Sequence, residues 1–266
     1  MSHSEITQPD GRTGEPPPPA PATNLVTAAD LLDAISDAVE TVAQTVARSM
    51  VAIRIERPGP LGAPGYPSQS HIGSVGSGVV ISSDGLIITA AHVVSRAEFI
   101  LVTSPVAGHG DVEYSAVVVG RNETDDLALI KIDATGLAPI DLTAARVAPG
   151  RVVLAVGRPP KIGFVVSNGI VNVLGRTTRN FTGDLVDGLI QTSAPVEPGV
   201  SGGALVDAHG RLAGIVTSAP DSTRAISFAV PAEKVSAMVN VLMPAAAGIA
   251  SPFDHSGTVG TVRTAD

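Results

Sequence analysis

The sequence contains no cysteine and no tryptophan, and aromatic residues make up 3% of its 266 residues. The absence of cysteine excludes disulfide bonds and thiolate metal sites. It does not identify the cellular compartment, because chains without cysteine occur on either side of a membrane. With so few aromatic residues, the core must be built from aliphatic side chains, chiefly valine, alanine and isoleucine.

Basic residues and long apolar runs are also scarce. Lys and Arg together number 17 against 25 Asp and Glu, which gives a net charge of −8, so we expect no nucleic-acid partner. No apolar run reaches the roughly 20 residues that span a membrane, and the polar start over residues 1–5 lacks the character of a secretory signal. We therefore expect no integral membrane segment and favour a cytoplasmic location.

Composition divides the two ends of the chain from its middle. Residues 1–28 are rich in proline and predict a disordered arm, and residues 244–266 predict a flexible tail. Residues 29–50 predict an amphipathic helix with Asp30 as its cap. This helix either packs on the main domain, joins subunits or covers a site. Its apolar face consists of Leu32, Ile35, Val39, Val42, Val46 and Met50.

The middle of the chain alternates short apolar segments with turn signals such as Ser82–Gly85. Segments of this length and spacing predict an all-β barrel or sandwich rather than a parallel α/β sheet. A second helix is predicted at 231–243, because Pro231 suits a first helical turn. The predicted strands are 50–55, 78–81, 86–89, 99–103, 113–119, 127–132, 152–156, 163–173, 188–192, 203–207, 212–217 and 226–229.

A glycine-flanked serine in residues 197–206 is the first candidate for chemistry. Ser201 lies between glycines and precedes an apolar run that reads as a buried strand. Glycines allow a tight turn and close approach of a substrate carbonyl, so the N–H groups of Gly199 and Ser201 are candidates for an oxyanion hole. The alternative is a simple turn that leads into a strand.

A histidine and an aspartate complete the pattern. His92 follows an apolar strand, and Asp126 stands at the start of another, although each also suits a purely structural role, and Asp125 competes with Asp126. The order His92, Asp126, Ser201 is that of the chymotrypsin-like double β-barrel. We expect the first barrel at about 51–136 and the second at about 150–230.

Five strings of residues resemble the HtrA-like (DegP-like) branch of the trypsin-fold serine proteases: 76–81, 89–94, 126–132, 199–206 and 226–231. The resemblance implies a protease domain over 51–243 that needs no cofactor or metal and hydrolyses unfolded or exposed polypeptides. It assigns His92 as general base, Asp126 as the group that orients it, and Ser201 as the nucleophile that forms an acyl-enzyme. It also implies an oxyanion hole made by Gly199 and Ser201. The same resemblance favours a location in the cell envelope, which is the alternative to the cytoplasm.

The sequence departs from the family pattern in several places. Val200 stands where the family usually has asparagine, and Ser193 where it usually has aspartate. Valine cannot make an amide's hydrogen bonds, which raises the alternative of a peptide-binding or chaperone-like protein with slow or conditional cleavage. Esterase activity would use the same residues. The family's usual C-terminal PDZ domain is not expected, and its N-terminal trimer-forming aromatics are not visible, so the oligomeric state stays open between a family-like trimer and other states.

The substrate pocket is predicted to be apolar, because no carboxylate stands where a trypsin-type pocket would hold one. Such a pocket favours small or medium aliphatic side chains by about 1–3 kcal/mol per well-fitted group. We assign the remaining histidines to solvated loops and expect no metal site. The predicted pocket residues are Pro195, Val196, Ile215, Val216 and Thr217, and the histidines are His71, His109, His209 and His255.

Overall fold

The computed structural model describes residues 27–58, 71–143, 145–180, 183–217 and 226–246. The predicted arm and tail lie almost wholly outside these residues. Residues from Asp37 onward form one compact unit. The preceding unit ends at Ser36, and its described part, residues 27–36, contains the start of helix α1 (Ala28–Ala47).

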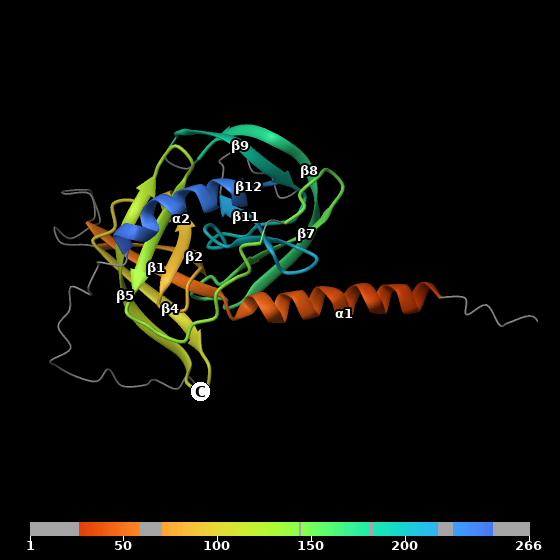
Figure 1. Cartoon of the computed structure of the whole chain (residues 1–266), viewed down its shortest axis with the longest axis horizontal. Helices are drawn as coiled ribbons and strands as arrows, with labels where there is room; N and C mark the ends of the chain where they lie inside the picture. Colours follow the sequence, from red (N-terminus) through yellow and green to blue (C-terminus); the bar gives the residue numbers. More distant parts are fainter. Residues whose placement is uncertain (1–26, 59–70, 144, 181–182, 218–225, 247–266) are drawn as a thin grey trace, which may run out of the picture. The chain divides into compact units, whose positions relative to one another are not determined.

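Two closed six-stranded barrels make up the main unit (Figure 1). The first has the strand order β1-β2-β3-β6-β5-β4, with antiparallel neighbours. The predicted double-barrel fold is therefore confirmed. The first barrel consists of β1 (Met50–Pro58), β2 (His71–Val80), β3 (Leu86–Ala90), β4 (Phe99–Val106), β5 (Gly110–Asn122) and β6 (Leu127–Ile132).

The second barrel has the strand order β10-β11-β12-β9-β8-β7, and helix α2 (Ala232–Ala246) follows it. Pro231 ends β12, so the helix begins one residue later than predicted. Strand β8 extends to Arg179, beyond the predicted end at 173. The barrel consists of β7 (Val152–Gly157), β8 (Val165–Arg179), β9 (Leu185–Thr192), β10 (Ala204–Asp207), β11 (Leu212–Thr217) and β12 (Ser227–Pro231).

Strand β3 illustrates why the apolar runs become central strands. All five of its residues are buried, and successive side chains point to opposite faces. Ile87 joins a core formed by first-barrel residues, whereas Leu86 and Ile88 join a second core that draws on both barrels and both helices. Because both faces are covered, the strand shows a continuous apolar run instead of an alternating pattern.

Helix α1 starts and ends earlier than the pattern predicted, since Met50 already belongs to β1. Its cap is Thr27 instead of Asp30: the Asp30 N–H donates to the Thr27 hydroxyl, and the Thr27 N–H donates to the Asp30 carboxylate. This reciprocal pair is a capping box. The second half of the helix buries Val42 and Val46. The exposed apolar side chains of its first half are Leu31, Leu32 and Ile35.

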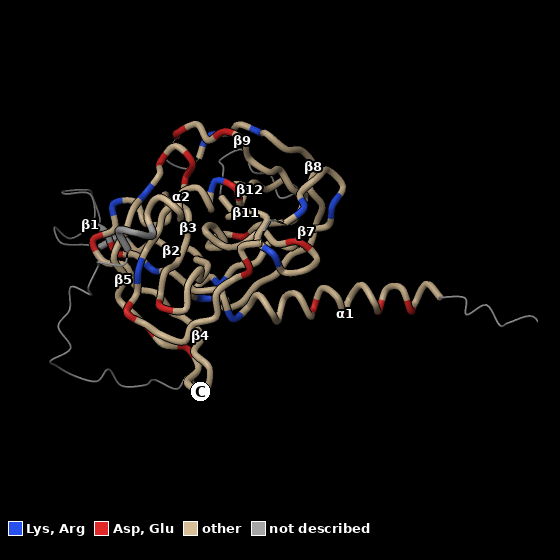
Figure 2. The backbone as a smooth tube through the Cα atoms, viewed as in Figure 1, with Lys and Arg blue, Asp and Glu red and all other residues tan. Residues whose placement is uncertain are grey.

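Charged residues of both signs lie interspersed along the backbone of the barrels, whereas α1 carries only acidic ones (Figure 2). Among the described residues no helix is both long and apolar enough to cross a membrane, and no cluster of three or more His, Asp or Glu could hold a metal ion. His109 and His209 are exposed, whereas His71 begins strand β2 instead of lying in a loop. His255 lies outside the described residues.

Asp207 holds the turn between β10 and β11. One carboxylate oxygen accepts hydrogen bonds from the Arg211 side chain at 2.9 and 2.7 Å, and the other accepts the backbone N–H groups of His209 and Arg211. Burial by itself would raise the pKa of Asp207, but the hydrogen bonds from Arg211 and His209 outweigh it and hold that pKa below its usual value.

The Asp207→Asn variant is therefore expected to lose stability less steeply in acid than the wild type. A carboxyl whose pKa is depressed by folding stabilises the protein above its unfolded pKa of about 3.9, and this contribution disappears as the pH falls through the folded value. The difference in free energy of unfolding between the two proteins should shrink between about pH 5 and about pH 2. Urea denaturation at each pH measures this difference. If the free energies of unfolding of the two proteins fell in parallel as the pH decreased, the lowered pKa of Asp207 would be contradicted.

Candidate active site

His92 lies in a single 3₁₀ turn (Ala91–Val93) that directly continues strand β3. Its Nδ1 is 2.8 Å from Oδ2 of Asp126, and its backbone N–H donates to Oδ1 of the same carboxylate at 3.0 Å. The His92 side chain is 11% exposed and the Asp126 side chain 1%. The two contacts fix both the position of the imidazole and the nitrogen that faces the carboxylate.

Asp126 occupies the turn between β5 and β6 with a left-handed backbone, at φ +53°. Its carbonyl accepts the N–H of Ala91 at 3.1 Å, and Oδ2 accepts the hydroxyl of Thr217 at 2.5 Å. Thr217 belongs to β11 of the second barrel, so this buried hydrogen bond connects the two barrels. A carboxylate is an acceptor only, which matches the donors around it.

Asp125, the competing carboxylate, contacts other partners. It accepts hydrogen bonds from Lys234 of helix α2 and from the side chain of Asn122. Lys234 also donates to the carbonyl of Asp187 at 2.9 Å. These contacts brace the turn in which Asp126 adopts its left-handed conformation, which carries an intrinsic cost for a residue other than glycine.

Ser201 lies in the turn between β9 and β10 and is 7% exposed. Gly199 precedes it at φ +93° and Gly202 follows at φ +83°, values that favour glycine. The Val200 carbonyl accepts the Gly203 N–H at 2.8 Å. Because a trans peptide is planar, the Ser201 N–H in the same peptide points away from that carbonyl. The contact therefore fixes the direction of the Ser201 N–H, which is one of the two predicted oxyanion donors.

Backbone contacts bring this turn to the end of β3. Ser77 of β2 donates its N–H to the Ser201 carbonyl at 2.8 Å, and its own carbonyl accepts the Thr89 hydroxyl at 2.7 Å. A methyl group on Gly202 would overlap both the Thr89 hydroxyl and the Ser77 carbonyl. The turn that carries Ser201 thus packs against the strand whose continuation carries His92.

The two departures from the family pattern have structural partners here. Val200 is 3% exposed and packs in the second-barrel core, with its side chain against Gly157. The Ser193 N–H donates to the Ile170 carbonyl at 3.0 Å, and its hydroxyl accepts the Ile170 N–H at 3.0 Å. Packing thus supports the turn that carries Ser201 at the position where the family uses an amide.

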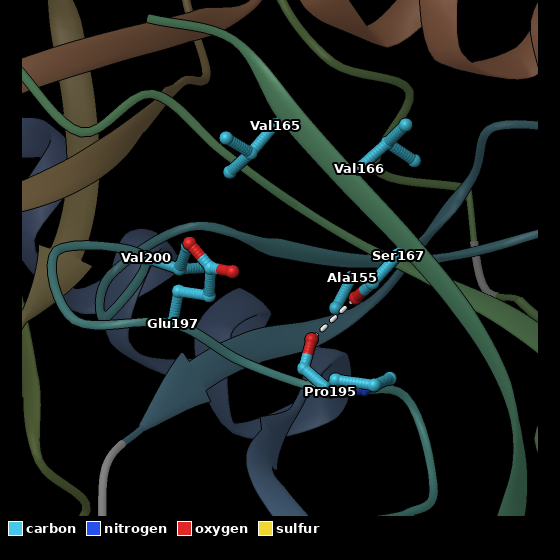
Figure 3. Close-up of a pocket in the computed structure, with 7 residues that line it drawn as sticks. All are labelled: Ala155, Val165, Val166, Ser167, Pro195, Glu197 and Val200. Carbon is cyan, nitrogen blue, oxygen red and sulfur yellow. Dashed lines mark hydrogen bonds between the residues drawn. The ribbon is translucent and has the colours of Figure 1, made fainter. Parts of the chain in front are cut away.

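A pocket of about 260 Å³ lies beside the turn (Figure 3). Of the five predicted pocket residues, Pro195 lines it. Ile215 and Val216 are buried in the hydrophobic cores, and the Thr217 hydroxyl lies on Asp126. Residues 218–225, which follow Thr217, are outside the described part, so the substrate pocket stays a prediction. The lining consists of Ala155, Val165, Val166, Ser167, Pro195, Glu197 and Val200.

Sequence reasoning missed two contributors to this site. Ser77 and Thr89 connect the turn that carries Ser201 (the nucleophile turn of the proposal below) to the first barrel, and neither was assigned a role. For Ser77 a signal was present, because it stands between Gly76 and Gly78 in a string already noted for family resemblance. Two glycines around a serine in a strand indicate close approach of another backbone.

Comparisons with known proteins agree with this geometry. Residues 76–215 match the family model described as a trypsin-like peptidase domain. The chain is 37% identical over 183 residues to the serine endoprotease DegS of Haemophilus influenzae and 38% identical over 184 residues to DegS of Escherichia coli K12. Each alignment covers 66% of this chain but only 52% and 50% of those proteins, so the chain spans about half their length. The solved structure of the HtrA-type protease AlgW with a decapeptide has a TM-score of 0.64 and 29% identity, covering 77% of this chain and 67% of that one.

Proposed function

Since the chain belongs to the trypsin-like peptidase family, we propose that it is a serine endopeptidase that hydrolyses unfolded or exposed polypeptides without a cofactor. The observation that carries the proposal is the paired contact of His92 with the buried carboxylate of Asp126, through Nδ1 at 2.8 Å and the backbone N–H at 3.0 Å. In a Ser-His-Asp triad the carboxylate orients the histidine through one ring nitrogen, and the other ring nitrogen carries out the proton transfer.

In the proposed mechanism the hydroxyl of Ser201 attacks the carbonyl carbon of the scissile bond. His92 takes the hydroxyl proton through Nε2 and then gives it to the leaving amine, while Asp126 keeps the imidazole in the right tautomer and stabilises its charged form. The N–H groups of Gly199 and Ser201 stabilise the oxyanion. Water then hydrolyses the acyl-enzyme through the same groups.

We propose substrates with small or medium aliphatic side chains at the cleaved bond. The support is the apolar character of the segment before the nucleophile, where Val196 packs against the second-barrel core and Pro195 lines the pocket. The alternative of peptide binding without efficient cleavage rested on Val200 and Ser193. We place it second because Val200 packs in the second-barrel core and Ser193 forms hydrogen bonds with Ile170. A cytoplasmic location and the oligomeric state stay predictions.

The proposal predicts that a fluorophosphonate probe labels the wild type and that Ser201→Ala abolishes labelling and casein cleavage together. Such probes phosphonylate a serine that is activated by a neighbouring base: the serine oxygen bonds to phosphorus, and fluoride leaves. Mass spectrometry of the labelled peptide identifies the modified residue, and gel analysis follows casein.

The matched control is Ser104→Ala. Ser104 lies in β4 and is fully buried, and its hydroxyl has no hydrogen-bond partner in the described structure. This variant should be labelled like the wild type. A wild type that neither reacts with the probe nor cleaves casein, or a Ser201→Ala variant that still cleaves, would refute the proposed function.

A further inference from the structure

We propose that Ser77 is a positioning residue that aligns both oxyanion donors of the nucleophile turn from the opposite barrel, an inference that rests on the proposed peptidase function. Its hydroxyl donates to the Gly199 carbonyl at 2.7 Å, and its backbone N–H donates to the Ser201 carbonyl at 2.8 Å. The two residues whose N–H groups are the proposed donors are therefore each tied, through their own carbonyl, to this one residue of the first barrel.

The direction of the hydroxyl proton follows from the contacts of Ser77. The backbone N–H of Arg158 donates to the Ser77 oxygen at 2.8 Å. A backbone N–H is always a donor, so the oxygen accepts there and its own proton is directed to the Gly199 carbonyl. The Arg158 guanidinium binds both oxygens of Asp111 in the first barrel, which helps to hold that N–H in place.

Ser77 can approach the turn only because its neighbours leave space. A methyl group on Gly76 would press on Val93 and lie 3.2 Å from the Ser201 carbonyl. On the other side, a methyl group on Gly157 would lie 3.0 Å from the Ser77 hydroxyl. Ser77 itself is completely buried, so no water replaces its hydrogen bonds. The absence of side chains at Gly76 and Gly157 therefore allows the two barrels to approach each other closely at Ser77.

The consequence for catalysis comes from the freedom of Gly199. At φ +93° this glycine has no side chain that would restrict its peptide groups. Oxyanion stabilisation requires donors that are aligned before the charge develops, and small misplacement of such groups lowers the rate strongly. The backbone angles of Gly199 are not restricted by a side chain, so the alignment has to come from elsewhere. The Ser77 hydroxyl supplies it.

The test compares Ser77→Ala with Ser104→Ala and wild type on a fluorogenic peptide taken from a casein site that the wild type cleaves. Ser77→Ala should lower kcat roughly 10- to 100-fold with KM unchanged, because the lost interaction acts in the transition state. The pH at half-maximal kcat should not move, since His92 and Asp126 keep their contacts. Ser104→Ala should match the wild type.

A second measurement separates alignment from a general loss of structure. A peptide aldehyde forms a tetrahedral adduct whose oxygen occupies the oxyanion site, so its inhibition constant should rise in Ser77→Ala by about the factor lost in kcat/KM. The constant for the corresponding peptide alcohol, which has no carbonyl and forms no adduct, should stay unchanged. Both constants are independent of the fraction of folded molecules, and the unfolding midpoint is recorded in parallel.

The outcomes are distinct for the two proposals. An active wild type with Ser77→Ala equally active, or changed only in KM, would overturn the role of Ser77 and leave the peptidase function standing. Equal weakening of the aldehyde and the peptide alcohol would also overturn it, because it would indicate a damaged cleft rather than misaligned donors. An inactive, unlabelled wild type would overturn the peptidase function and this inference with it.

Discussion

Asp126→Asn is expected to lower kcat about 10⁴-fold while the fold is retained, the magnitude typical of this substitution in serine proteases. The reason lies in the donors around the carboxylate. The backbone N–H of His92 donates to Oδ1 and cannot change its role, so the asparagine oxygen has to take that position. The amide NH₂ then faces Nδ1 of His92, which must become an acceptor and carry its proton on the other nitrogen. In that tautomer His92 cannot accept a proton from Ser201.

The matched control for this variant is Asp125→Asn in the same turn. Asp125 binds Lys234 and Asn122, so its replacement breaks a partly exposed ion pair of modest value and leaves the His92 contacts in place. Steady-state kinetics of both variants, with circular dichroism to verify folding, decide the matter. A larger loss of kcat in Asp125→Asn than in Asp126→Asn would show that the wrong carboxylate had been assigned.

Gly202→Ala is expected to abolish activity and to lower the free energy of unfolding by about 2–5 kcal/mol. The left-handed backbone at φ +83° costs an alanine about 1–2 kcal/mol. The added methyl group would also overlap the Ser77 carbonyl and the Thr89 hydroxyl. The turn cannot simply move aside, because the Gly202 N–H donates to Val216 at 2.8 Å and Ser77 holds the Ser201 carbonyl. Relief of the overlap therefore displaces Ser201.

The Gly175→Ala variant separates the cost of the left-handed backbone from the cost of the steric overlap. Gly175 in β8 has a similar φ of +76°, but nothing lies within 4 Å of the position its methyl group would take. This variant should lose only the conformational part, about 1–2 kcal/mol, and remain active. Urea denaturation and kinetics measure both variants. Equal losses of stability and activity would mean that contact with the first barrel does not hold the nucleophile turn.

The sequence predicted the strands and the fold class well where a signal is local. The apolar segment at 127–132 and the Asp-Gly turn before Leu86 appear where expected, because side-chain burial and turn geometry act over a few residues. The ends of the helices and of strand β8 were less well predicted. The helix cap is Thr27 instead of the predicted Asp30. The Thr27 hydroxyl accepts the N–H of Asp30, the third residue of the helix, and the Asp30 carboxylate accepts the N–H of Thr27.

The details of the site depended on partners that are distant in sequence. Thr217 was expected in the substrate pocket, but its hydroxyl lies on Asp126, 91 residues away. Val200 was expected to leave the turn poorly supported, because its side chain forms no hydrogen bond, whereas packing against Gly157 in the second-barrel core supports it. Neither result follows from residue type, since a hydroxyl or a methyl group stabilises a site only through its neighbours.

By itself the sequence determined the order of the elements, their aliphatic character and the three residue types of the candidate triad, because these depend on composition and on near neighbours in the chain. The family resemblance had favoured Asp126 over Asp125, and the tertiary structure shows that Asp126 contacts His92. Only the tertiary structure decided that Ser77 holds Gly199 across 122 residues. The physical reason is that closure of each barrel sets which strands and turns meet at the junction, and hydrogen bonds across that junction depend on this register rather than on any local pattern.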